Sequence, residues 1–142
     1  MTRETLKIES LPNQMDLAAV SAMLNEHNAD QGLVYDPRAL NIFVRDERGN
    51  VIAGLIGSTY WDWLRISKLA VAKSARDQGL GTRLLQAAEE EARKRGCSNV
   101  FVDTFSFQAI SFYKSLGYKV FAELPEYPKG HTRYFLTKKL EP

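Results

Sequence analysis

Apolar positions recur at helical spacing in three segments of this chain and follow strand-like patterns between them. In the clearest segment, residues 81–95, the side chains of Leu84, Leu85, Ala88 and Ala92 form one stripe opposite a charged face. Gly96 follows at once, which is typical of a helix end. The pattern predicts a helix over residues 81–95.

The same criteria predict two further helices and seven strands. Apolar residues at helical spacing from Met15 to Glu26 predict an N-terminal helix, and those from Gln108 to Leu116 predict a short one closed by Gly117. Residues 28–37 favour an irregular connection, because Gly and Pro break regular elements. The expected strands cover residues 7–11, 41–45, 51–61, 63–72, 99–104, 118–124 and 131–140.

The order of these elements indicates the fold class. Helices interleaved with strands imply at least one parallel crossover within a mixed sheet. We therefore expect a single α/β (α+β) domain over residues 1–142.

Composition and charge narrow the functional class. The chain has 142 residues, 44% hydrophobic and 25% charged, which is typical of a water-soluble globule. The net charge of +2 is spread along the chain, so nothing favours a nucleic-acid partner. No apolar run approaches the roughly 18–20 residues of a membrane span. Acidic residues among the first twenty argue against a secretory signal, and Cys97 is the only cysteine, so a cytoplasmic protein is expected.

The most informative stretch for chemistry is a glycine-rich turn that leads into the helix at residues 81–95. Arg76 precedes Gly79 and Gly81, which lie where the helix begins. Helix N-termini expose unpaired N–H groups, and glycines allow an anion to approach them. The backbone amides of Gln78 to Thr82 could therefore hold a diphosphate, with Arg76 adding a charged contact. The alternative is that the two glycines only permit a tight turn.

Two motifs resemble a known family. Arg76-x-x-Gly79-x-Gly81, after the strand end Leu69-x-Val71, resembles the Arg/Gln-x-x-Gly-x-Gly/Ala signature of the GNAT superfamily of acetyl-CoA-dependent N-acetyltransferases. A second segment, from Ala109 through Phe112-Tyr113 to Gly117-Tyr118, is similar to the family's Ala-x-x-Phe-Tyr-x-x-x-Gly-Phe/Tyr segment. The resemblance covers nearly the whole chain, most securely residues 66–118.

The resemblance implies a mixed, mostly antiparallel sheet of about six or seven strands, flanked by three or four helices. The sheet would be splayed between the strand ending at Val71 and the strand 99–104, and the pantetheine arm of acetyl-CoA would lie in the opening. The expected contacts to acetyl-CoA come from Leu69, Ala70, Val71, Arg76, Gln78, Gly79, Leu80, Gly81, Thr82 and Ser106. The reaction implied is direct attack of an amine of a small molecule or peptide on the thioester.

Tyr113 is the residue that the resemblance implies as general acid for the leaving thiolate. A phenol with a pKa of about 10 keeps its proton at neutral pH and can donate it. The alternative is that Tyr113 only packs beside Phe112.

Three residues depart from the family pattern. Asp77 stands where many members have glycine, beside the proposed diphosphate site. Ser106 replaces a frequent asparagine, and Lys68 lies where several members place a glutamate base. Asp103 is then the nearest carboxylate to serve as base and shares a strand face with Phe101. Capping of the next segment by Asp103, or proton transfer through water, are the alternatives.

The acceptor side carries no motif. The run from Tyr60 to Trp63 could line an amine pocket or form an aromatic corner, and Tyr127 and His131 lie in a loop that borders the acceptor site in this family. No clustering of histidine or cysteine supports a metal. A GNAT-like domain that binds acyl-CoA without turnover is the alternative to an enzyme. A homodimer, paired through an apolar edge at residues 134–136, and a monomer both fit the sequence.

Overall fold

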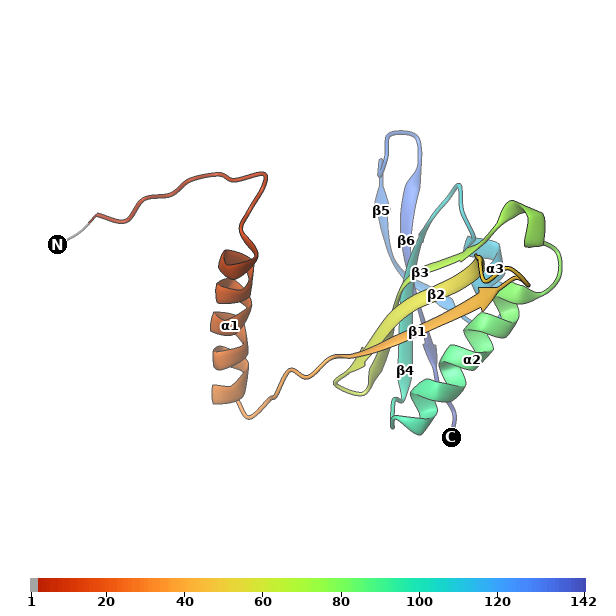
Figure 1. The fold of residues 1–142 in the computed structure, drawn as a ribbon, viewed down its shortest axis with the longest axis horizontal. Coiled ribbons are helices and arrows are strands. Elements are labelled where there is room, and N and C mark those ends of the chain that lie inside the picture. The colour runs from red at the N-terminus through yellow and green to blue at the C-terminus, as the bar shows by residue number, and fades with distance from the viewer. Residues whose placement is uncertain (1–2) are drawn as a thin grey trace. The chain divides into compact units, whose positions relative to one another are not determined.

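The computed structural model describes residues 3–142 (Figure 1). The chain divides into two units, Met1–Asp36 and Pro37–Pro142, each with its own internal contacts.

The first unit contains one helix, α1 (Gln14–Asp30). The Asn13 side chain caps it by accepting a hydrogen bond of 2.6 Å from the backbone N–H of Met15. The predicted strand at residues 7–11 is wrong, because this stretch is irregular. A strand needs a neighbour to pair with its backbone groups, and no ladder includes these residues.

The helix α1 is longer than predicted and ends differently. It continues through residues that the sequence assigns to an irregular connection. Gly32, at φ 79°, then turns the chain, and the N–H groups of Gly32 and Leu33 donate to the carbonyls of Ala29 and Asn28. None of the side chains of α1 is buried, so its helically spaced apolar residues form no core within this unit.

The second unit is built on a six-stranded sheet with the order β1-β2-β3-β4-β6-β5. The strands are β1 (Arg38–Arg45), β2 (Val51–Tyr60), β3 (Trp63–Val71), β4 (Asn99–Phe105), β5 (Lys119–Pro125) and β6 (Thr132–Lys139). All neighbours are antiparallel except β3 and β4, which are parallel. The predicted mixed, mostly antiparallel sheet is confirmed. The expected apolar edge at residues 134–136 is wrong, because β6 lies between β4 and β5.

The parallel crossover between β3 and β4 runs through helix α2 (Leu80–Lys94), which packs on β1, β2 and β3. The predicted stripe of α2 is confirmed, because Leu84, Leu85, Ala88 and Ala92 are all buried. They meet the sheet side chains Leu55, Leu64, Ile66, Val100 and Leu136 in one core. Helix α3 (Ile110–Ser115) follows β4, and none of the helices within residues 3–142 is long and apolar enough to cross a membrane.

The sheet is splayed at its centre. The pairing of β3 with β4 runs from Trp63 with Asn99 to Ile66 with Val102 and then stops. Beyond this point β3 stays paired with β2 as far as Val71, and β4 stays paired with β6 as far as Phe105. The two halves of the sheet therefore separate, as expected.

A buried ionic cluster ties α2 to the last strand. Glu89 of α2 is almost fully buried and accepts hydrogen bonds from the Tyr118 hydroxyl (2.7 Å) and from the Lys138 ammonium (3.0 Å). Burial, followed by the hydrogen bond to Glu89, raises the pKa of Tyr118. The cluster joins α2, β6 and the residue before β5.

We expect Glu89→Gln to lower the free energy of unfolding by about 1–3 kcal/mol, because a hydrogen-bonded buried carboxylate is replaced by a neutral amide. Urea denaturation gives the value. The matched control is Glu90→Gln, on the same helix with 61% of its side chain exposed, which should change stability by less than about 0.5 kcal/mol. Equal effects of the two variants would contradict a stabilising role for the cluster.

Candidate active site

The separation of β3 and β4 opens a cavity of about 750 Å³, a size common for small-molecule sites. Its walls come from the end of β3, the end of β4, the following loop and α3. They include Ser67, Lys68, Leu69, Ala70, Val71, Arg76, Val102, Asp103, Thr104, Phe105, Phe107, Gln108, Ala109, Phe112 and Tyr113. Six of the predicted site residues are among them: Leu69, Ala70, Val71, Arg76, Asp103 and Tyr113.

The β3 wall offers backbone groups that β4 does not pair. Leu69, Ala70 and Val71 pair with Leu55, Gly54 and Ala53 of β2 on one side. On the other side β4 no longer pairs with them. A ligand with amide groups could bind this edge as an added strand does.

The N-terminus of α2 follows this wall after a short 3₁₀ helix, η1 (Lys73–Ala75). Gly79 is the N-cap residue at φ 76°, a left-handed conformation that favours glycine, and no side chain caps the helix. The first backbone bond into α2 is donated by Arg83 to Gly79. The amides of Leu80, Gly81 and Thr82 precede that bond, so they have no helical partner and are oriented to meet an anion.

The two motifs of the sequence meet in space. A Cβ added to Gly81 would lie 3.3 Å from Cζ of Phe112, so the absence of a side chain lets the start of α2 pack on α3. Gly79 has nothing within 4 Å of such a Cβ, and its role is conformational. Each glycine therefore serves the turn for a different reason.

Tyr113 lines the cavity and is only 4% exposed. Its ring packs edge-on against Phe112 and Tyr118, and its hydroxyl makes no hydrogen bond to the residues that the structure describes. Burial, with a smaller effect of the negative charge of Asp103, raises the pKa of Tyr113 to about 12. The phenol is therefore protonated at neutral pH and free to donate into the cavity.

Asp103 faces the cavity from β4 and is held by Arg133 of β6. Its Oδ1 accepts from Nε (3.0 Å) and Nη2 (2.8 Å) of Arg133, whereas no described residue bonds to Oδ2. The burial pattern of β4 confirms that Phe101 and Asp103 share one face. The capping alternative for Asp103 is wrong, because Thr104 Oγ1 accepts from the N–H of Ala109 instead.

Some predicted site residues do not line the cavity. The turn beside it is formed by Gln78, Gly79, Leu80, Gly81 and Thr82, and a Cβ added to Gly81 would lie within 4.0 Å of the lining residues Phe112 and Val71. The Ser106 hydroxyl accepts from the N–H of Thr132 and meets Nδ1 of His131 at 3.3 Å, so it joins the loop after β4 to the β5–β6 turn.

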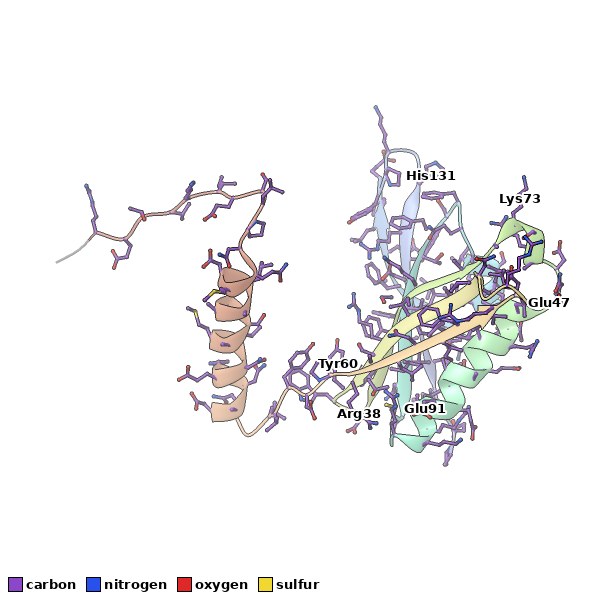
Figure 2. All side chains as sticks on the ribbon, viewed as in Figure 1. Arg38, Glu47, Tyr60, Lys73, Glu91 and His131 are labelled. Carbon is purple, nitrogen blue, oxygen red and sulfur yellow. The ribbon has the colours of Figure 1, made fainter. Side chains whose placement is uncertain are left out.

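The acceptor candidates separate in space. Figure 2 shows His131 at the β5–β6 turn and Tyr60 at the opposite end of the sheet, beside the β2–β3 turn. The aromatic run from Tyr60 to Trp63 therefore lies away from the cavity, which is lined by the other end of β3.

Sequence reasoning missed three residues that the structure places at the site. Phe105 and Phe107 line the cavity after Asp103, and Arg133 holds that carboxylate. Strand alternation from Phe101 through Asp103 to Phe105 was the available signal for the first of them. No local pattern indicated that Arg133 pairs with Asp103.

Comparison with known proteins decides the family. The family model described as Acetyltransferase (GNAT) family matches residues 10–118. This chain belongs to the GNAT acetyltransferase family. Members of this family use acetyl-CoA, and the assignment makes the chain an enzyme rather than a binding module without turnover.

Individual relatives agree with the assignment. The GNAT chain is 40% identical over 111 residues to blasticidin-S acetyltransferase of Streptomyces morookaense, covering 75% of this chain and 82% of the relative. The structure of an acetyltransferase from Bacillus cereus superposes with a TM-score of 0.82 at 29% identity, covering 94% of this chain and 98% of that one. An aminoglycoside 6′-N-acetyltransferase solved with coenzyme A, at 19% identity, shares the fold, with a TM-score of 0.63 over 73% of this chain and 74% of that chain.

We expect Gly81→Ala to destabilise the GNAT enzyme by about 1 kcal/mol. Crowding of the added methyl group against Phe112 lowers the free energy of unfolding by about 1–3 kcal/mol. The better helix propensity of Ala raises it by about 1 kcal/mol. In the Phe112→Leu background the same change should be neutral or stabilising, because the ring is gone. Urea denaturation of the four proteins measures this coupling, and purely additive effects would contradict the contact.

Proposed function

We propose that this enzyme transfers the acetyl group of acetyl-CoA to a primary amine of a small molecule or peptide, with Tyr113 as general acid. The observation that carries the proposal is Tyr113, a largely buried side chain at the cavity wall whose phenol is protonated and has no hydrogen-bond partner among the described residues. Asp103 lines the same cavity. The name of the blasticidin-S acetyltransferase relative supports a small-molecule acceptor.

The donor would bind along β3 and the start of α2. The free edge at Leu69, Ala70 and Val71 suits the amide groups of the pantetheine arm, as an added strand. The amides of the α2 N-terminus suit the diphosphate, and Gln78 lies in the same turn. Arg76 lies in the chain between β3 and α2, and its Nε donates to the carbonyl of Val71 at 3.3 Å. Its guanidinium adds a positive charge between these two parts of the site.

The chemistry needs positioning and one proton donor. The amine nitrogen forms a bond to the thioester carbonyl carbon, and the carbon–sulfur bond breaks. Tyr113 donates its proton to the departing sulfur. The proton lost by the amine passes to Oδ2 of Asp103 or to water, since Oδ1 is engaged by Arg133. Positioning in the cavity and general acid catalysis both lower the barrier.

We expect acetyl-CoA to raise the thermal stability of the protein, by about 2.7 kcal/mol at one hundred times its dissociation constant. ATP and NAD serve as control ligands and should give no comparable shift.

Arg76→Gln should weaken acetyl-CoA binding at least tenfold, since a charged hydrogen bond contributes about 1.5–3 kcal/mol. Arg48→Gln, in the exposed β1–β2 turn, is the matched control. Absence of a shift at millimolar acetyl-CoA would end the donor assignment.

We expect Tyr113→Phe to lower kcat by about 10²–10⁴-fold while the dissociation constant of acetyl-CoA stays nearly unchanged. The variant keeps the ring packing and removes only the proton donor. Steady-state kinetics with a turned-over amine and calorimetric titration of acetyl-CoA measure the two effects. A variant with unchanged kcat would show that Tyr113 only packs.

We also infer that residues 1–142 act as one domain, because the family match crosses the boundary between the two units. A homodimer stays a prediction. Its support is β5, which is one of the two edge strands of the sheet. Light scattering that shows only a 16.1 kDa species at micromolar concentration would exclude the dimer.

A further inference from the structure

An aromatic cluster lies beside the end of β4, and two of its rings, Phe105 and Phe107, line the cavity. Phe105 and Phe107 come from the end of β4 and the loop after it, and Tyr127 comes from the β5–β6 turn. The ring centroids of Phe105 and Phe107 are 5.4 Å apart in a stacked arrangement, and those of Phe105 and Tyr127 are 5.6 Å apart. We call Phe105, Phe107 and Tyr127 the aromatic platform.

Contacts with Arg133 and His131 hold the aromatic platform in place. The Arg133 guanidinium lies over the rings of Phe105 (5.4 Å) and Tyr127 (5.1 Å), and its Nη1 donates to the Tyr127 hydroxyl at 3.2 Å. His131 packs edge-on against Phe107 at 4.9 Å. Rings fixed in this way lose little further freedom when a ligand stacks on them.

The same contacts leave ring surface open. Phe107 is 54% exposed and lines the cavity, and Tyr127 is 45% exposed. Arg133 also joins the aromatic platform to Asp103, whose Oδ2 has no partner among the described residues. An open aromatic ring and an available carboxylate oxygen thus border one cavity.

The strand fixes their separation. Asp103 and Phe105 are two residues apart on one face of β4, which corresponds to about 7 Å along the strand. Asp103 and Tyr113 line the same cavity, so an ammonium held at Oδ2 would share that cavity with the proposed general acid. Phe107 stacks on Phe105 at 5.4 Å and lines the same cavity as Asp103, so a ring on Phe107 and an amine at Asp103 would be joined by a short linker.

From this arrangement we propose that the aromatic platform selects acceptors whose primary amine is carried, through a short linker, on a planar aromatic or heteroaromatic ring. The ring stacks on Phe107, and the amine meets Asp103. The proposal rests on the proposed function, because it names the substrate class of that same site.

The test compares two acceptors of matched size, 2-phenylethylamine and 2-cyclohexylethylamine, which differ in the planarity of the ring. We expect kcat/KM to be about threefold to tenfold higher for the aromatic amine, the ratio that a stacking contact provides. Phe107→Leu should abolish this preference by lowering kcat/KM for the aromatic amine more than for the cyclohexyl amine. Phe107→Trp should restore it. Phe121→Leu, an exposed ring of β5 outside the cavity lining, is the matched control and should keep the preference.

Three outcomes overturn the proposal: equal use of both amines by the natural enzyme, a parallel loss for both amines in Phe107→Leu, or loss of the preference in Phe121→Leu. Calorimetric titration of both amines in the presence of CoA provides a readout that needs no turnover, and equal or absent binding also overturns it. Acetylation of both amines without ring preference would leave the proposed function intact. If acetyl-CoA binds but no amine is acetylated, the proposed function is wrong. In that case the ratio of the binding constants of the two amines, measured by titration, still tests the role of the aromatic platform.

Discussion

The end of pairing between β3 and β4, after Ile66 and Val102, is the constraint on which the site depends. Two strands can separate inside a sheet only if each keeps its other neighbour, since unpaired backbone groups in a protein interior are costly. Here β2 holds β3 and β6 holds β4 throughout the opening. The gap therefore has two firm walls, and the edges that face each other are available to a substrate.

The contact between Gly81 and Phe112 joins the chemistry to this opening. It seats the start of α2 against α3, so the amides proposed to bind the diphosphate have a fixed position relative to the helix that carries Tyr113. One close approach of backbone to ring thus relates the anion site to the proton donor. The buried cluster of Glu89, Tyr118 and Lys138 ties α2 to β6, and the Tyr118 ring packs against Tyr113.

Local patterns predicted the parts of the molecule that are locally determined. The stripe of α2 and the position of Gly79 at the start of that helix follow from spacing within a few residues. The strand predicted at residues 7–11 failed because a strand exists only with a partner. Arg133 was missed for the same reason: its pairing with Asp103 follows from the register of β6 on β4, which local spacing does not reveal.

The two walls of the cavity have separate origins in the chain, and this separation has an evolutionary consequence. The groups proposed to bind the donor lie on β3 and α2, whereas Asp103 and the aromatic platform lie on β4 and around the β5–β6 turn. Under the proposed function, substitutions in the short β5–β6 turn would change which amine is accepted and leave the proposed acetyl-CoA contacts in place. A lineage built on this scaffold could diversify its acceptors rapidly and keep a single donor.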